Sequence, residues 1–129
     1  MNKLTSQRSA ADENAYIAYK KTHSNFCSFC ELDKSASKLI KDYGIFMIVS
    51  NAFPYATWDR GKVTEHIMLT PKRHVESLSL FTDDELKEFA TLLAKYESIG
   101  YNFYGRSYGS EFKSIKHQHT HLIKTEMSS

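Results

Sequence analysis

The chain has 129 residues, of which 41% are hydrophobic, and a formal net charge of +2 at pH 7. This length and apolar content predict one domain with a core of its own. Acidic and basic residues are interspersed without a basic block, which argues against a nucleic-acid binder, while the slight positive balance suits a small molecule that carries phosphate. The polar N-terminus and the lack of a long apolar run predict neither a signal peptide nor a membrane helix, so we expect a cytoplasmic protein with no membrane partner.

The first part of the chain carries a helix start signal. Ser9 is followed by Asp12 and Glu13, which fits a helix N-cap with acidic residues in the first turn. We expect this helix to run to about His23. Residues 1–24 would then form an N-terminal helical extension that packs on the domain or on a partner subunit, and residues 25–129 would form the domain itself.

Two apolar stretches in the middle of the chain predict strands. Residues 43–49 are rich in side chains that favour strands and form the expected central strand, after a linker rich in Lys and Ser. Residues 66–70 form a second strand, which ends at Pro71. Residues 58–63 are expected to form the loop before it.

A helix signal follows these strands. Thr82 and Glu85 have the spacing of a capping box, in which each side chain binds the other residue's backbone N–H. We therefore expect one amphipathic helix over residues 83–98, closed by Gly100. Its apolar side chains recur at helical spacing and should face the core: Leu86, Phe89, Leu92, Leu93 and Tyr96.

The last third of the chain predicts a strand at residues 101–104, a loop at 105–113 and a strand at 115–124. Strands with one long helix among them indicate an α+β domain. We expect an antiparallel sheet flanked by the long helix and by the N-terminal helix.

Three histidines lie in the last of these strands. His117, His119 and His121 stand at i, i+2 and i+4, a spacing that points all three rings to one face of a strand. Each imidazole needs polar partners, so such a face is a poor core and a good active site near neutral pH. A purification tag, a solvated cluster or a plain metal site are the alternatives. A tag is disfavoured because Gln118 and Thr120 interrupt the run and Leu-Ile follows it, as in a folded strand.

Cys27 and Cys30 form a Cys-x-x-Cys pair. In a cytosolic chain this spacing indicates metal or redox chemistry more than a structural disulfide. Two thiolates can fill two corners of a tetrahedral zinc site, and downstream histidines can supply the others. The alternative is a pair of reduced core cysteines without metal.

The run His117-x-His119-x-His121, followed by Leu-Ile, resembles the signature of the histidine triad (HIT) family of nucleotide hydrolases and transferases. Residues 65–74 resemble the family's strand and Pro-Lys-x-His segment, and residues 26–30 resemble its Cys-x-x-Cys, so the likeness covers about residues 26–124. Gln118 and Thr120 depart from the motif, which has apolar residues there. The resemblance implies an open sheet of about five strands and a homodimer in which the long helix and a neighbouring strand meet their copies.

The resemblance also implies roles for the site residues. His119 would attack the α-phosphate of a purine nucleotide, and His121 would bind phosphate oxygens or hold a tautomer. Ser114 would hydrogen-bond the phosphate or assist the leaving group, with a plain surface serine as the alternative. Asn51 would meet the ribose, with a turn-forming role as the alternative. His66 is expected to face the triad and support one of its rings by hydrogen bonding.

A zinc-containing branch of the family, similar to galactose-1-phosphate uridylyltransferase, implies a structural Cys₂His₂ site. Its ligands here would be Cys27, Cys30, His74 and His117, with His66 as a competing ligand. A histidine committed to zinc cannot also act as the attacking base.

These features predict a hydrolase that forms a nucleotidyl-histidine intermediate and acts on a nucleoside phosphoramidate or dinucleoside polyphosphate. A nucleotidyl transferase is the alternative within the same chemistry. A nucleotide-binding module with little turnover is an alternative from another class. So is a zinc-knuckle interaction protein, in which the histidines serve only the metal.

Overall fold

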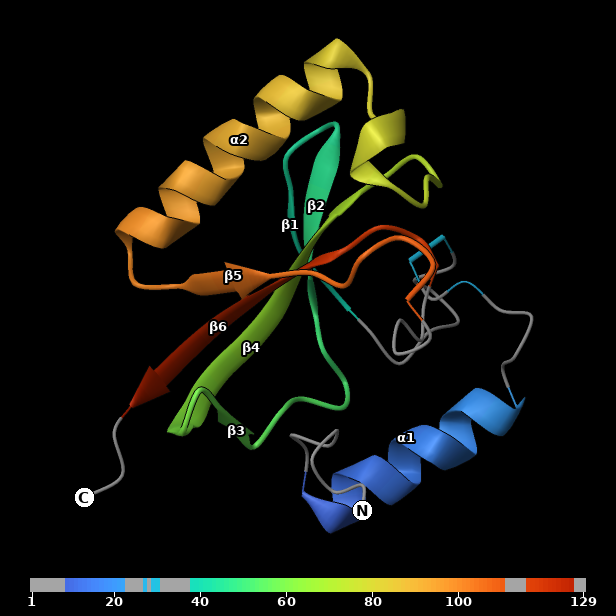
Figure 1. Ribbon diagram of the computed structural model, residues 1–129, viewed down its shortest axis with the longest axis vertical. Coiled ribbons are helices and arrows are strands. Elements are labelled where there is room, and N and C mark those ends of the chain that lie inside the picture. The colour runs from blue at the N-terminus through green and yellow to red at the C-terminus, as the bar shows by residue number, and fades with distance from the viewer. Residues whose placement is uncertain (1–8, 23–26, 28, 31–37, 111–115, 127–129) are drawn as a thin grey trace.

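A computed structural model describes residues 9–22, 27, 29–30, 38–110 and 116–126 of the chain. Its centre is a six-stranded sheet whose described strands all pair antiparallel, in the order β1-β2-β4-β6-β5, with β3 paired to β4 (Figure 1). The predicted α+β class with an antiparallel sheet is therefore confirmed. The strands are β1 (Leu39–Asp42), β2 (Phe46–Ser50), β3 (Thr57–Trp58), β4 (Gly61–Pro71), β5 (Asn102–Tyr104) and β6 (Thr120–Glu126).

The strand β1 lies in the segment that the sequence predicts to be a linker, so that prediction is wrong. All four of its residues are exposed, because β1 is an edge strand that covers no core. A tight turn separates it from β2, with Gly44 at a φ of 98° and a bond from Tyr43 N to Phe46 O of 2.9 Å. The turn also explains why β2 begins at Phe46 and not at residue 43.

The predicted loop at residues 58–63 is likewise wrong, since this segment forms a hairpin. β3 pairs with the start of β4, and the two loop residues Asp59 and Arg60 have positive φ values of 51° and 66°. Positive φ at both central positions is the geometry of a two-residue hairpin turn that matches strand twist. β4 is therefore eleven residues long, well beyond the predicted 66–70.

The long helix α2 (Asp83–Ser98) has the predicted bounds. Both bonds of the capping box between Thr82 and Glu85 are present, and Gly100 follows the helix with a φ of 104°. Leu92 and Tyr96 are buried, and Phe89 and Leu93 pack against the same core. Leu86 is 45% exposed, so its predicted place in the core is wrong.

The two faces of the sheet bury different residues. On the face covered by α2, a core cluster contains Phe46, Ile48, Leu69 and Leu122, together with the helix residues (Figure 1). Alternate residues of the same strands point to the other face, where Met47, Val49 and Met68 form a second cluster with Phe29. Met68 pairs with His121 in the register of β4 and β6, so this second face is the one that carries the histidines.

The N-terminal helix α1 (Ala10–Thr22) forms as predicted, with Ser9 Oγ accepting from Asp12 N at 3.2 Å. Residues 23–26 are outside the described part of the chain, so the domain boundary after residue 24 and the packing partner of α1 stay predictions. Within the described residues, no helix combines the length and the apolar character needed to cross a membrane.

One ion pair joins the start of α2 to the segment that follows β4. Arg73 donates from Nε and one terminal nitrogen to the buried carboxylate of Glu85, at 3.0 and 2.7 Å. The hydrogen bond from Arg73 holds the pKa of Glu85 below its usual value, against the opposing effect of burial. A carboxyl with a lowered folded-state pKa stabilises the fold above its unfolded pKa and loses this contribution as the pH falls through the folded pKa.

We predict that Glu85→Gln lowers the free energy of unfolding by about 1 to 2 kcal/mol at pH 7, because it weakens both the capping box and the ion pair. The difference from wild type should shrink as the pH falls below the ordinary carboxyl pKa of 4.5. Urea unfolding at several pH values measures this, with the exposed Glu97→Gln as the control. A difference that stays constant down to pH 3 would contradict the linkage.

Candidate active site and metal cluster

The histidine segment enters the sheet later than predicted. β6 begins at Thr120, so His121 lies in the strand while His117 and His119 precede it, and the predicted strand over 115–124 is corrected. The reason is a change of backbone partners before Thr120. Gln118 N donates to Val75 O at 2.7 Å, and the hydroxyl of Thr70 donates to Gln118 O at 2.7 Å, in place of ladder bonds to β4.

The three rings nevertheless stay in one row. The ring centroids of His119 and His121 are 5.1 Å apart. Phe29 contacts the rings of both His117 and His119, at 5.5 and 5.2 Å between centroids. All three histidines are buried, and the most exposed of them, His119, is 9% exposed.

The prediction that His66 supports a triad ring by hydrogen bonding is confirmed. His66 Nε2 lies 2.8 Å from His121 Nδ1, and the backbone N–H of Tyr55 donates to His66 Nδ1 at 3.1 Å. A backbone N–H can only donate, so His66 Nδ1 is the acceptor, and a neutral His66 carries its proton on Nε2. That proton points to His121 Nδ1, which leaves the proton of a neutral His121 on its own Nε2.

A backbone group also fixes the tautomer of His119. Its Nδ1 lies 2.9 Å from the backbone carbonyl oxygen of His117. A carbonyl oxygen can only accept, so Nδ1 carries the proton and the lone pair of a neutral His119 is on Nε2. The ring therefore presents a basic nitrogen on the side away from its own backbone bond.

Two tyrosines that the sequence reasoning did not assign to the site enclose His121. The ring of Tyr104 stacks on it at 4.7 Å and 16°, and Tyr55 lies at 5.6 Å and 24°. The hydroxyls of the two tyrosines are hydrogen-bonded to each other. Tyr104 sits opposite His121 in the pairing of β5 with β6, a register that no local sequence signal reveals.

Asn51 and Ser114 are the two remaining residues that the sequence predicts to contact the substrate. Asn51 lies beside the histidines, with its Nδ2 3.3 Å from His66 Nε2, but both nitrogens are donors in the tautomer assigned above. Its Oδ1 accepts from Phe53 N at 2.9 Å, as in a turn-forming asparagine, and its contact with a ribose stays a prediction. Ser114 lies outside the described residues.

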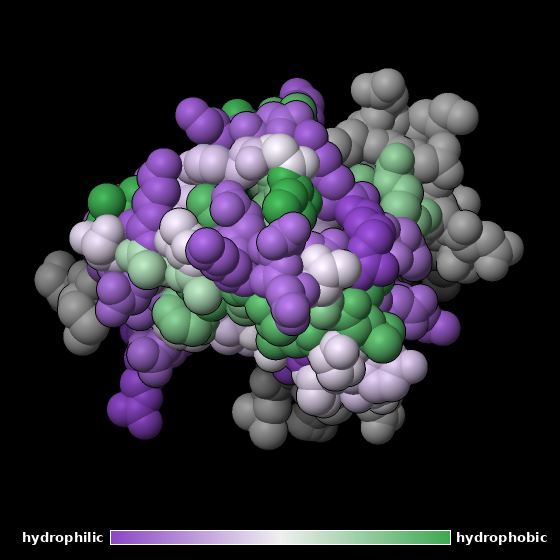
Figure 2. Space-filling model, turned by 90° about the horizontal axis from the view of Figure 1, so that it is seen from above, coloured by the Kyte–Doolittle hydropathy of each residue, from purple (hydrophilic) through white to green (hydrophobic). Residues whose placement is uncertain are grey.

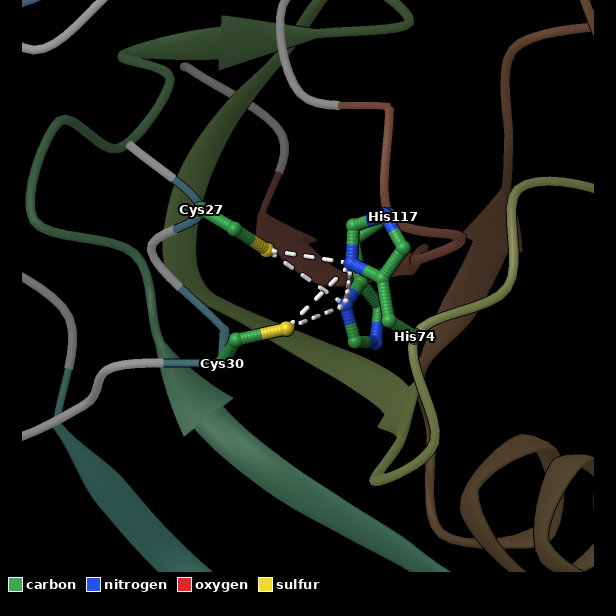
Figure 3. Close-up of side chains that lie close together, drawn as sticks. All are labelled: Cys27, Cys30, His74 and His117. Atoms are coloured by element: carbon green, nitrogen blue, oxygen red, sulfur yellow. Dashed lines mark hydrogen bonds between the residues drawn. The ribbon is translucent and has the colours of Figure 1, made fainter. Parts of the chain in front are cut away.

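Cys27, Cys30, His74 and His117 come together from distant parts of the chain, with one donor atom of each inside a cluster 4.8 Å across (Figure 3). The Nδ1 atoms of the two histidines lie 3.2 Å apart. Both sulfurs lie 3.5 Å from His117 Nδ1, and they lie 3.5 and 3.2 Å from His74 Nδ1. Cys27 and Cys30 do not form a disulfide with each other.

The surroundings of His117 prepare it to bind a cation. Its Nε2 donates to the carbonyl oxygen of Pro71 at 2.7 Å, so the lone pair of the neutral ring is on Nδ1, inside the cluster. His74 has a carboxylate oxygen of Glu76 3.7 Å from its outer nitrogen. The cluster could therefore hold a metal ion. His66, the competing ligand, is instead bonded to Tyr55 and His121.

No model of a known protein family matches the sequence, and no curated protein matches it. Solved structures do match. A HIT family hydrolase from Clostridium thermocellum has 15% identity and a TM-score of 0.57, with 80% of this chain and 93% of that chain covered. A histidine triad protein from Clostridium difficile has 20% identity and a TM-score of 0.57, with 80% and 94% covered.

A third match is a hypothetical histidine triad nucleotide-binding protein from Sulfolobus tokodaii. It has 22% identity and a TM-score of 0.57, with 80% of this chain and 71% of that chain covered. At these identities the likeness concerns the fold. The chain therefore has the fold of the histidine triad proteins.

Proposed function

We propose that the chain is a histidine triad nucleotide hydrolase and that His119 is its nucleophile. The observation that carries this proposal is the bond from His119 Nδ1 to the carbonyl oxygen of His117. This bond leaves the lone pair on Nε2, and a neutral imidazole nitrogen is a competent nucleophile toward phosphorus. The likeness of the fold to histidine triad proteins, one of them named a hydrolase and one a nucleotide-binding protein, supports the same reading.

In the first step, the Nε2 lone pair of His119 forms a bond to the α-phosphorus of a purine nucleotide. The bond from phosphorus to the leaving group breaks, and the leaving group departs with the electron pair and takes up a proton. His121 is placed to assist, because its proton is on Nε2 and its ring is held by His66 and two tyrosines. Its N–H donates to a phosphate oxygen or to the leaving group as negative charge develops.

In the second step, water attacks phosphorus and the bond between phosphorus and Nε2 breaks. The electron pair returns to His119, the water proton is released, and the product is a nucleoside monophosphate. We assign nucleoside phosphoramidates or dinucleoside polyphosphates as substrates. Asn51 would meet the ribose, Ser114 the phosphate, and His66 would act through His121.

A nucleotidyl transferase would share the first step and replace water with another acceptor. A nucleotide-binding module would retain the site with little turnover. The cytoplasmic location and the homodimer also stay proposals. Measurement of turnover separates the module from the two enzymes, and the products formed with water alone separate hydrolase from transferase.

Zinc fits the cluster of Cys27, Cys30, His74 and His117. Ligand bond lengths of about 2.3 Å for sulfur and 2.05 Å for nitrogen give a tetrahedron whose edges are about 3.3 Å between nitrogens and about 3.6 Å between nitrogen and sulfur. The corresponding distances are 3.2 Å and 3.2 to 3.5 Å. Four protein donors make a closed, structural site, so zinc would supply a cross-link and no chemistry of its own.

We predict that His119→Ala lowers the hydrolysis of adenosine 5′-phosphoramidate by at least about 10³-fold, because the lone pair that attacks phosphorus is lost. Binding of adenosine monophosphate should change only a few-fold, and calorimetry measures it. His23→Ala removes a histidine outside the motif and is the control. Turnover by His119→Ala at the wild-type rate would refute the nucleophile assignment. Tight binding without turnover by wild type would favour the binding module.

A second prediction concerns the protons of the rings. In ¹⁵N-labelled protein at a pH where the rings are neutral, long-range ¹H–¹⁵N spectra should show His119 protonated on Nδ1 and both His66 and His121 protonated on Nε2. These tautomers follow from the fixed donors and acceptors around each ring. If His119 instead carries its proton on Nε2, that nitrogen has no lone pair and the proposed attack cannot occur.

A third prediction concerns the metal. Protein purified with reduced thiols should contain about one zinc per chain, and Cys27→Ala should contain little. Chelation should lower the free energy of unfolding of wild type, by about 4 kcal/mol if free zinc was at 1,000 times its Kd. Chelation should leave the already metal-poor Cys27→Ala unchanged. Wild-type protein without zinc, and without any loss of stability on chelation, would show that the cluster is not a zinc site.

A further inference from the structure

Two aromatic rings continue the row of imidazoles beyond His121. Tyr104 stacks on His121 with 4.7 Å between ring centroids and 16° between planes, and Trp58 stacks on Tyr104 at 6.0 Å and 16°. We refer to His121, Tyr104 and Trp58 as the aromatic stack. Tyr104 and Trp58 are half-buried, so the outer part of the stack is accessible to solvent at the edge of the candidate active site.

The hairpin of β3 and β4 holds Trp58 close to β6. Trp58 stands opposite Gly61 in the pairing of these two strands. A Cβ on Gly61 would lie 3.0 Å from the Cβ of Thr125, so only glycine lets the hairpin approach the end of β6 this closely. Tyr104 stands opposite His121 in the pairing of β5 with β6. The aromatic stack is therefore assembled by strand register from β3, β5 and β6.

The aromatic stack lies on a different surface from the expected homodimer contact. α2 covers the opposite face of the sheet, and Figure 2 is seen from that side, where separate hydrophobic areas lie among hydrophilic residues. Strand pairing between copies uses backbone groups at the edge of β5, whereas the Tyr104 side chain leans inward over His121. A dimer through α2 and β5 would extend the sheet sideways and would not cover the histidine face.

Arg106 adds a positive charge beside the aromatic stack. Its Cζ lies 5.7 Å from the centre of the Tyr104 ring. A guanidinium keeps its charge at all ordinary pH values, and its planar fork matches the oxygens of a phosphate. The cation therefore stands beside the ring that contacts both His121 and Trp58.

The leaving group of the proposed reaction points toward this stack. In phosphoryl transfer the attacking and leaving atoms lie roughly in line on opposite sides of phosphorus, so the leaving group extends away from His119. His121 carries its proton on Nε2 and is placed to give it to the leaving group. The leaving group then lies against His121, where the aromatic stack begins. This direction rests on the proposed role of His119 as nucleophile.

We propose that Trp58 and Arg106 form a subsite for a leaving group that consists of a polyphosphate ending in a second nucleobase. The base stacks on Trp58, and Arg106 binds a phosphate between that base and the α-phosphate. Trp58 is two ring spacings away from His121, a distance that a chain of phosphates spans and the amine of an unsubstituted phosphoramidate does not. Every nucleobase has a π face, so stacking accepts different bases.

Diadenosine triphosphate is a substrate of this class. Attack by His119 Nε2 on its α-phosphorus breaks the bond to the bridging oxygen, and adenosine diphosphate departs with the electron pair and a proton from His121. Water then attacks phosphorus, the bond to Nε2 breaks, and a water proton returns to His121. The products are one adenosine monophosphate and one adenosine diphosphate.

Trp58 is the only tryptophan of the chain, so its fluorescence reports on the stacking. The γ-methyl ester of adenosine triphosphate is the matched probe, because it keeps the phosphate chain and lacks the second base. With His119→Ala, which should not consume either probe, diadenosine triphosphate should quench the fluorescence and bind about tenfold more tightly in calorimetry. The methyl ester should leave the fluorescence nearly unchanged. Binding without quenching, equal affinity for the two probes, or no binding of either would overturn the proposal.

Variants made in the same background assign the preference to residues. Trp58→Leu should abolish the tenfold preference in calorimetry, whereas Trp58→Phe keeps an aromatic face and should retain a preference of a few-fold. Arg106→Gln should weaken both probes by a similar factor and keep the preference. Ile40→Ala is the control, since it shortens an exposed apolar side chain on the edge strand β1 and should change neither affinity. A preference that survives Trp58→Leu would show that Trp58 does not hold the second base.

Turnover by wild type separates this subsite from the proposed function. Wild type should cleave diadenosine triphosphate with a higher kcat/KM than the methyl ester. Quenching and tight binding of diadenosine triphosphate without cleavage of any of the substrates, adenosine 5′-phosphoramidate included, would refute the hydrolase and support the subsite. Cleavage of diadenosine triphosphate and the methyl ester with equal kcat/KM would refute the subsite and support the hydrolase.

Discussion

His117 is the residue on which the arrangement of the site depends, because its two ring nitrogens and its backbone carbonyl oxygen each contact a different part of the site. Its Nε2 donates to Pro71 O at the end of β4, and its Nδ1 lies among the two cysteines and His74. Its backbone carbonyl accepts from His119 Nδ1. A fully buried ring held at both nitrogens fixes the backbone next to it. The orientation of His119 therefore follows from contacts made by its neighbour.

The sheet separates this site from the main core. α2 and the residues that alternate with the histidines fill one face, whereas the opposite face carries the imidazoles and a smaller cluster around Met68. Pairing of β4 with β6 brings His66 and His121 to that face as diagonal neighbours, since His66 pairs with Ile123 and Met68 with His121. The site is thus supported by a sheet whose larger hydrophobic cluster lies on the other side.

Local signals explain what the sequence predicts well. The bounds of α2 follow from the Thr82–Glu85 capping box, Gly100 and apolar spacing, all of which act within a few residues. The Cys-x-x-Cys pair and the histidine spacing likewise identify side chains that the fold brings together. Leu86 is the one apolar residue of the predicted helix face that is exposed, because helical spacing alone does not show how much of that face the sheet covers.

Features that depend on distant partners are harder to predict. β1 has no buried side chain, so its strand character comes only from pairing with β2. The late start of β6 depends on bonds from Gln118 to Val75 and Thr70, which no spacing within the histidine motif contains. Tyr104 reaches His121 through the register of two strands, and a register shifted by one residue would place it on the other face.

The tautomer of each imidazole in the row traces back to a backbone group. Pro71 O sets His117, His117 O sets His119, and Tyr55 N–H sets His66, which in turn sets His121. Backbone groups cannot exchange donor and acceptor roles as hydroxyls can. The direction of every proton in the row is therefore determined by how the chain is folded around it. This constraint gives neighbouring rings different tasks: a lone pair on Nε2 of His119 and a proton on Nε2 of His121.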